Sequence, residues 1–276
     1  MPDKYKATWV SHSSISDYLN CPRAYYLKNV YKDPQTGRKI TVMNPDLAMG
    51  QAVHNVLESL SENSAENRFN DPLQSKLEQE WEKISGEKGG FKTKEQEQDY
   101  KEQAQKMIKR VEQNPGPLRN LATKRNSELL DFWLDEDKEI ILCGKIDWFE
   151  YLPDEEGVHI IDFKTGQKKD RSDSLQLSIY YLLADECQKW SIKKTSFWHL
   201  REDASPNEQA LPDRNLAREK IMNVATDIKS AREHDNFPCR EGGNCFYCTP
   251  FEKVINGEAT LVGTDDEFNK DIYITN

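Results

Sequence analysis

The sequence has no apolar run approaching the roughly 20 residues that a membrane-spanning helix requires. Its first six residues also lack the apolar core of a signal peptide. Hydrophobic residues make up 36% and charged residues 31% of the 276 positions, and the mean hydropathy is −0.86. A chain of this length can bury a substantial core. We therefore expect a cytoplasmic protein without a membrane segment.

Acidic residues outnumber basic ones. The 38 lysines and arginines face 48 acidic residues, which gives a net charge of −10 and a pI near 5.2. This balance argues against a protein that coats nucleic acid nonspecifically. It leaves room for a local basic groove, because Lys164, Lys168, Lys169 and Arg171 follow one another closely. The chain shows no internal repeat.

The middle of the chain predicts a β-hairpin. Residues 140–151 and 158–163 are rich in β-branched and aromatic residues, and residues 153–157 between them have the proline, acidic residues and glycine of a turn. Two adjacent strands are the expected result.

Two carboxylates and a lysine belong to this hairpin. Residues two apart share one face of a strand, so Asp162 and Lys164 point the same way, and a paired Asp147 could join them. Such a set offers oxygen ligands to a hard divalent cation, with an ammonium that positions a water or a phosphate. The alternative is a surface hairpin with solvated ion pairs of little worth. Apolar neighbours make an unpaired Asp162 costly, which favours the metal site.

Apolar residues at helical spacing indicate most of the remaining structure. They predict helices over residues 13–28, 45–60, 173–187 and 213–233, and the pattern of residues 194–201 predicts another strand. Ser13 or Ser14 is the expected N-cap of the first helix, which Pro22 should interrupt. His54 lies beside the apolar stripe of the second helix. Residues 61–118 form a polar, mostly helical insertion without evident chemistry.

Three of the six cysteines lie close together near the carboxyl end. Cys239, Cys245 and Cys248 fall in a loop-like segment, residues 237–250, which lets three thiolates converge on one metal centre. A fourth ligand must come from elsewhere, and Cys21 is the best candidate. Such a centre would clasp the two ends of the chain together.

The identity of that metal is open at this stage. All-sulfur ligation suits a structural zinc or an iron-sulfur cluster, and spacing alone does not separate them. A disulfide framework is not expected in a cytosolic chain. Cys143 and Cys187 lie within a predicted strand and a predicted helix, where packing explains them better.

Gln176 and Tyr180 are four residues apart and therefore share one helix face. They could form the ordinary polar edge of a buried helix. Beside the hairpin, their amide and phenol are also suitable partners for Lys164 or for a phosphate oxygen.

Taken together, these motifs resemble the RecB-like branch of the PD-(D/E)XK nucleases, including CRISPR-associated exonucleases of spacer acquisition and AddB-type iron-sulfur nuclease domains. They run in the family's order from residue 11 to residue 248. The motifs are Ser11-x-Ser13-x-Ile15-x-x-Tyr18-x-x-Cys21-Pro22-Arg23-Ala24-Tyr25, Gly50-x-x-x-His54, Gly144-Lys145-Ile146-Asp147, Asp162-Phe163-Lys164-Thr165-Gly166, Gln176-x-x-x-Tyr180 and the terminal cysteines.

The resemblance implies an α/β fold with a restriction-endonuclease-like mixed sheet flanked by helices, and cleavage of DNA with Mg²⁺ or Mn²⁺. It assigns metal binding to His54, Asp147, Asp162 and the backbone carbonyl of Phe163. It assigns catalytic roles to Asp147, Asp162, Lys164, Gln176 and Tyr180, and it matches Glu128 to an acidic residue before the hairpin.

The resemblance also favours a 4Fe-4S cluster over zinc on Cys21, Cys239, Cys245 and Cys248. Two departures from the family pattern stand out. Ile146 replaces the proline of the superfamily name, and many relatives have a last cysteine near the position of Val254. Cys239 would substitute for that ligand.

The sequence thus predicts one nuclease domain over residues 1–276, with the helical insertion 61–118 and the cysteine loop 237–250. The expected activity is exonucleolytic, on single-stranded DNA or DNA ends, in recombination and repair or in CRISPR adaptation with protein partners. A noncatalytic DNA-binding or assembly module of the same fold is the alternative. A sequence-specific endonuclease would need base-reading elements that the sequence does not reveal.

Overall fold

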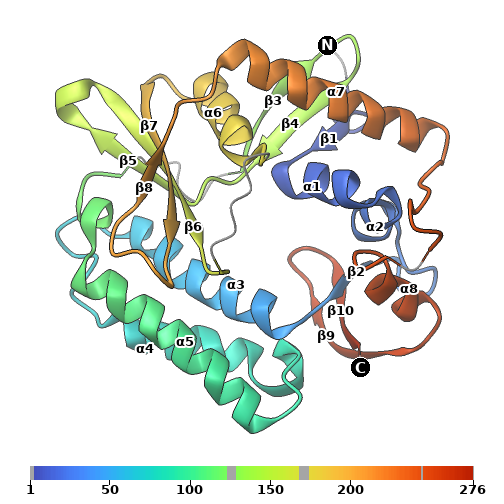
Figure 1. Cartoon of the computed structure of the whole chain (residues 1–276), viewed down its shortest axis with the longest axis horizontal. Coiled ribbons are helices and arrows are strands. Elements are labelled where there is room, and N and C mark those ends of the chain that lie inside the picture. The colour runs from blue at the N-terminus through green and yellow to red at the C-terminus, as the bar shows by residue number, and fades with distance from the viewer. Residues whose placement is uncertain (1–2, 123–128, 168–173, 244, 276) are drawn as a thin grey trace.

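The computed structural model describes residues 3–122, 129–167, 174–243 and 245–275 (Figure 1). Within these residues the strands form three sheets, with helices packed around them. The sheets are, in spatial order, β1 (Thr8–Val10), β4 (Ile140–Gly144) and β3 (Leu130–Asp135); β5 (Trp148–Leu152), β6 (Gly157–Lys164), β7 (Ser191–His199) and β8 (Asn207–Gln209); and β2 (Lys39–Val42), β10 (Lys270–Thr275) and β9 (Ala259–Asp265). Each sheet contains parallel and antiparallel pairs, so the predicted mixed α/β class is confirmed.

The α-helices surround these sheets. They are α1 (His12–Asn20), α2 (Pro22–Tyr25), α3 (Pro45–Glu58), α4 (Leu73–Ile84), α5 (Lys94–Gln113), α6 (Gln176–Cys187), α7 (Arg214–Glu233) and α8 (Thr249–Ile255). A π-helical turn, Tyr26–Val30, continues α2. None of the described helices is both long and apolar enough to cross a membrane.

The first predicted helix is divided, and its start differs from the prediction. Ser11, not Ser13 or Ser14, caps α1: its hydroxyl accepts from the Ser14 N–H at 3.3 Å, while the Ser14 hydroxyl accepts from the Ser11 N–H at 2.8 Å. This reciprocal box requires residues three apart, which Ser11 and Ser14 are. The predicted interruption at Pro22 is confirmed, because Cys21 is extended and Pro22 begins α2. Cys21 therefore lies at the break between two helices.

Helix α3 confirms the second predicted helix and carries His54. The Asn44 side chain accepts from the Leu47 N–H at 3.0 Å and caps the helix. A Cβ added at Gly50 would lie 3.1 Å from the Thr165 hydroxyl oxygen just beyond β6. The missing side chain thus lets α3 approach the end of β6, and His54 follows one turn later.

The predicted hairpin is confirmed for β5 and β6, which pair from Trp148 opposite Ile161 to Leu152 opposite Gly157. The expectation of one continuous strand over residues 140–151 is wrong. Strand β4 ends at Gly144 and pairs with β1 and β3, whereas β5 belongs to another sheet. Between them the chain turns, and the Asp147 carboxylate accepts from the Phe163 N–H at 2.8 Å. A contact distant in sequence therefore interrupts a stretch of high strand propensity.

The sheet of β5 to β8 separates two hydrophobic cores. On one face Trp148, Ile161, Phe163 and Trp198 pack with α3, α4 and α5, and the other face packs with α6 and α7. Both tryptophans are fully buried. Helices α4 and α5 lie within residues 61–118, and α6 and α7 confirm the helices predicted over 173–187 and 213–233, although α6 begins at Gln176.

A third hydrophobic core contains the clustered cysteines. Cys21, Cys245 and Cys248 pack there with Leu27 and Phe251, close to the sheet of β2, β10 and β9. In Figure 1 this sheet and α8 lie beside α2, so segments from both ends of the chain meet. The sequence patterns had not indicated β9 and β10.

Candidate active site

The predicted catalytic residues converge at the end of β6. Asp162 is 1% exposed, and one of its carboxylate oxygens lies 2.6 Å from the Lys164 ammonium. The other oxygen accepts from the Gln176 amide N–H at 2.6 Å. Gln176 also accepts from Lys164 through its carbonyl oxygen and donates to the Tyr180 hydroxyl at 3.1 Å. Gln176 thus connects Asp162, Lys164 and Tyr180, while Tyr180 is held through Gln176.

His54 and Asp147 lie beside this group. The His54 Nδ1 atom is 3.5 Å from the Asp147 oxygen that accepts from the Phe163 N–H. The Asp147 side chain is 11% and the His54 side chain 26% exposed, so both can be reached from solvent. The role given to the Phe163 carbonyl stays a prediction.

Sequence reasoning missed one neighbour, Glu58. Its carboxylate lies 3.7 Å from the His54 Nδ1 atom and also pairs with Lys145. One ligand atom each from His54, Glu58 and Asp147 lies within 4.8 Å of the other two, whereas Asp162 is outside this group. The available signal was spacing, since residues four apart share one face of a helix.

Burial and the neighbouring carboxylates shift the pKa values of three residues in the site. Burial and the charge of Asp147 raise the pKa of Asp162 to about 7, although Lys164 and His54 act against this. Burial lowers the pKa of His54, but the nearby carboxylate of Asp147, together with that of Glu58, raises it to about 10. Burial, followed by Asp162, places the pKa of Tyr180 well above its usual value. Bound protons thus compensate charge that a divalent cation would neutralise in their place.

The four predicted cysteine ligands also come together. The Cys248 sulfur lies 3.3 Å from that of Cys245 and 3.6 Å from that of Cys239, and all four sulfurs, including that of Cys21, lie within 4.8 Å of one another. The six cysteines all lie within the described residues, and none of them forms a disulfide. Backbone N–H groups of Glu241 and Gly243 lower the pKa of Cys239 to about 6. The thiolate form of Cys239 is therefore favoured at neutral pH.

These sulfur positions can be compared with the two expected metals. A zinc ion with bonds of about 2.3 Å sets its four sulfurs about 3.8 Å apart. An iron-sulfur cubane binds each thiolate to a different iron and so requires wider spacing. The observed distances are close to those of a zinc site and shorter than those a cubane requires. Cys143 and Cys187 lie in β4 and α6, as predicted, outside this group.

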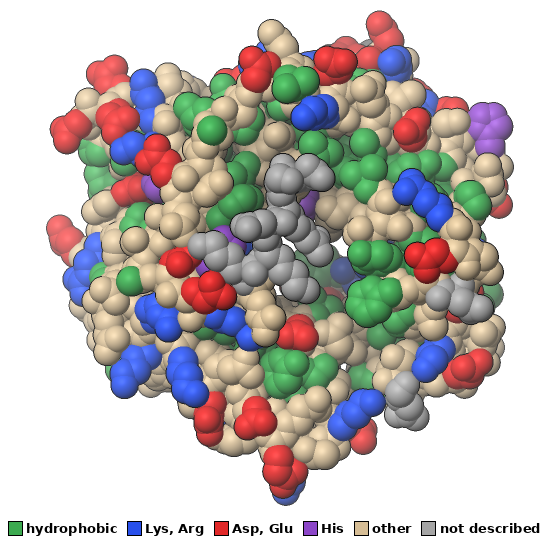
Figure 2. Space-filling view, viewed as in Figure 1, with side chains coloured by type: hydrophobic (Ala, Val, Ile, Leu, Met, Phe, Trp, Pro, Cys, Tyr) green, Lys and Arg blue, Asp and Glu red, His purple; other side chains and the backbone are tan. Residues whose placement is uncertain are grey.

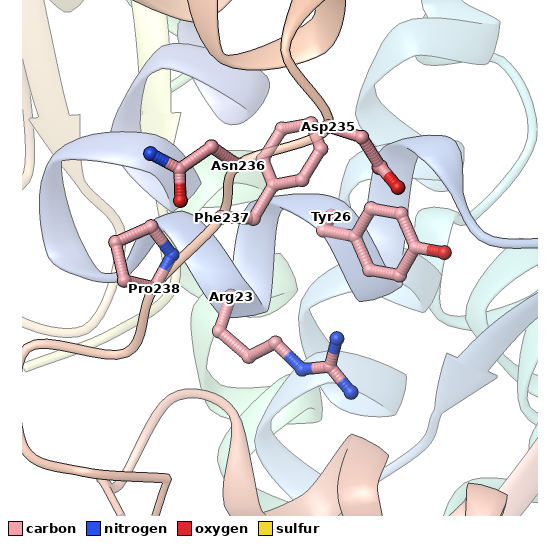
Figure 3. A pocket seen from close by; sticks show the side chains of 6 residues that line it. All are labelled: Arg23, Tyr26, Asp235, Asn236, Phe237 and Pro238. Carbon is pink, nitrogen blue, oxygen red and sulfur yellow. The ribbon is translucent and has the colours of Figure 1, made fainter.

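A pocket of about 300 Å³ adjoins the cysteine group, since Pro238 on its wall precedes Cys239 and Tyr26 packs against the core that contains Cys21 (Figure 3). Arg23 on its wall is paired with Glu252 at 2.6 Å, and the rings of Tyr26 and Phe237 are 5.0 Å apart. None of the candidate catalytic or cysteine residues lines it, so it has no evident part in the chemistry described above.

Some predicted residues cannot be placed. Glu128, Lys168, Lys169 and Arg171 lie outside the described residues. On the face shown in Figure 2, basic side chains are interspersed with acidic ones, in keeping with the net charge of −10.

Comparison with known proteins gives the family. Residues 9–251 match the PD-(D/E)XK nuclease superfamily. A crystal structure from Eubacterium rectale, of a protein provisionally described as an exonuclease, superposes with a TM-score of 0.50 at 12% identity, covering 88% of this chain and 87% of that one. This likeness supports the fold. No curated protein matches the sequence significantly. Because the family match spans most of the chain, the protein belongs to the PD-(D/E)XK nuclease superfamily.

Proposed function

We propose that the protein is a Mg²⁺- or Mn²⁺-dependent deoxyribonuclease that acts as an exonuclease on single-stranded DNA or DNA ends. The observation that carries this proposal is the buried Asp162, held between Lys164 and Gln176 and placed beside Asp147 and His54. A bound cation would act as a Lewis acid and lower the pKa of a bound water. The donor set, carboxylates and an imidazole, suits such an ion.

Each residue has a proposed part in phosphodiester hydrolysis. His54, Asp147, Asp162 and the Phe163 carbonyl would hold the cation. Lys164 orients the attacking water or the phosphate oxygens and stabilises the charge that develops on them. The two hydrogen bonds of Gln176 to Asp162 and Lys164 fix the spacing between carboxylate and ammonium.

Tyr180 acts indirectly, through its hydrogen bond with Gln176. Its hydroxyl accepts the second N–H bond of the Gln176 amide, and it is 7% exposed. We assign it the part of keeping that amide in the orientation that serves both Asp162 and Lys164.

The cysteine group has a structural part in this proposal. Cys21, Cys239, Cys245 and Cys248 hold either a 4Fe-4S cluster or a zinc ion and join the two ends of one domain, residues 1–276. Within it, residues 61–118 are a helical insertion and residues 237–250 the cysteine loop. None of the proposed catalytic residues lies in either cysteine segment, so the centre supports the fold and not the chemistry.

The biological setting is proposed from the resemblance. Recombination and repair, or CRISPR adaptation with protein partners, would supply DNA ends. The exonuclease description of the Eubacterium rectale protein favours action at ends. The alternative, a noncatalytic DNA-binding or assembly module, would be favoured by loss of Asp147, Asp162 or Lys164, and all three are present.

Cleavage of end-labelled linear and circular single-stranded DNA tests the proposal. We expect Asp162→Ala or Lys164→Ala to reduce cleavage with Mg²⁺ or Mn²⁺ by several orders of magnitude and to leave the circular dichroism spectrum unchanged. Asp154→Ala, an exposed acid in the same hairpin, is the matched control. Wild-type cleavage by either purified variant would remove the assignment, and cleavage of circles would replace exonuclease by endonuclease action.

A further inference from the structure

Glu58 lies where a cation ligand would lie and where a purely structural acid is poorly placed. It is the last residue of α3, and one 3₁₀ turn, Ser59–Glu62, continues from it, so its carboxylate lies near the carboxyl end of the helical segment, where a negative charge is unfavourable. Its side chain is 17% exposed, so the carboxylate has also lost much of its hydration. An acid in this position needs a positive partner.

The three ligand atoms of His54, Glu58 and Asp147 face one another without bonding well. The Nδ1 atom of His54 is 3.5 Å from the Asp147 oxygen and 3.7 Å from the Glu58 oxygen, both too long for good hydrogen bonds. Oxygen and nitrogen atoms around one Mg²⁺ lie about 3 Å apart when adjacent and about 4 Å apart when opposite. The atoms therefore surround a space that fits one ion after small movements.

Lys145 supplies a positive charge from the other side. Its ammonium pairs with the second oxygen of Glu58, and its side chain is 45% exposed. It lies two residues before Asp147, in the break between β4 and β5. Because its side chain is half exposed, the ammonium regains water when it leaves Glu58, and a cation can then replace it as the positive partner of that carboxylate.

We propose that Glu58 is a further ligand of the active-site cation, and that Lys145 competes with the cation for Glu58. This inference rests on the proposed function and deepens it. Glu58 adds a carboxylate to the His54 and Asp147 ligands, whereas Asp162 is shared with Lys164 and Gln176. Lys145 then sets the cation concentration at which the site fills.

Binding of Mn²⁺ in the absence of DNA, followed by the electron paramagnetic resonance signal of the free ion, tests this inference apart from activity. We expect Glu58→Gln to weaken binding by about 10-fold or more. We expect Lys145→Ala to strengthen binding about 3-fold, because the cation then no longer competes with an ammonium group for the Glu58 carboxylate. In the double variant the gain from Lys145→Ala should disappear, since the lysine acts through Glu58.

Two controls match these charge changes. Glu62→Gln alters an exposed acid one turn beyond Glu58, and Lys138→Ala alters an exposed lysine in the turn between β3 and β4. Neither should change the affinity. Thermal unfolding in EDTA identifies any variant that fails to fold, and the gain in affinity of Lys145→Ala cannot come from damage.

The outcomes separate the inference from the proposed function. If Asp147→Ala abolishes Mn²⁺ binding while Glu58→Gln binds like the wild type, the inference is overturned and the nuclease site stands. If Lys145→Ala strengthens binding equally with and without Glu58, the competition is overturned. If the wild type binds no Mn²⁺, both proposals fall.

Discussion

Asp162 should destabilise the metal-free protein above neutral pH, and Asp162→Asn should remove this cost. Burial and Asp147 raise the pKa of the carboxyl group from 3.8 to about 7 in the folded state. The folded protein thus keeps a proton that the unfolded chain has already released. The free energy of unfolding consequently falls as the pH rises from about 4 to about 7. About three pH units at about 1.4 kcal/mol each give a cost of about 4 kcal/mol.

Urea unfolding in EDTA measures this cost. Asparagine keeps the shape and lacks the charge, so Asp162→Asn should be more stable than the wild type at pH 8 by up to about 4 kcal/mol. Near pH 4 the two should be almost equal. The raised pKa of His54 adds stability that is present below about pH 6.5 and lost as the pH rises toward 10. Asp147, the main group that raises this pKa, is present in both proteins, and the variant loses only the smaller contribution of Asp162. Asp154→Asn, at an exposed acid, should change nothing.

The same variant should lose its response to metal. If Mn²⁺ binds as proposed, it should stabilise the folded wild type by mass action, and the gain should be much smaller in Asp162→Asn. A variant no more stable than the wild type at pH 8, with the same dependence on pH, would refute the view that ionised Asp162 is held in the fold at a cost.

Two predictions concern the cysteine group and the path of DNA. The resemblance to iron-sulfur nuclease domains implies that protein purified without oxygen is brown, carries about four irons per chain and bleaches when Cys21 or Cys248 becomes serine. A colourless protein with one zinc per chain, which the sulfur distances also fit, would establish the zinc site instead. The affinity for single-stranded DNA should depend weakly on salt, because we expect the protein to make few phosphate contacts. The slope of log affinity against log salt should decrease when Lys168 and Lys169 become alanine. An unchanged slope would mean that the DNA binds elsewhere on the protein.

Local pattern was sufficient for the elements that carry most of the candidate site. Helical spacing gave α3 with His54, and strand propensity with turn chemistry gave the hairpin of β5 and β6 with Asp162 and Lys164. Helix α6, with Gln176 and Tyr180 four residues apart, followed from the same reasoning. In each case neighbours in sequence determine which side chains share a face, so a single sequence contains the information.

Contacts between distant residues explain what the patterns could not predict. The stretch from β4 to β5 continues in strand-forming residues, and only the bond from Phe163 to Asp147 reveals why the chain turns there. Strand β10 pairs in parallel with β2, with Lys270 opposite Lys39. Such pairing depends on tertiary packing and leaves no local signature.

The candidate site is built on residues of two hydrophobic cores, so cation binding would depend on the packing of both. His54 and Glu58 come from α3, whose buried face packs in the core with Phe163, while Ile146 and Tyr180 pack in the core on the other side of the sheet. Asp147 lies between β4 and β5, which belong to different sheets. Asp162 lies on β6, which both cores cover. The ligand atoms can meet only when both cores are packed. Since a site of this kind does not exist in the unfolded chain, the free energy of cation binding adds to the stability of the folded state. A change deep in either core, far from any ligand, therefore weakens the affinity for the cation to the extent that it lets α3 or α6 move relative to β6.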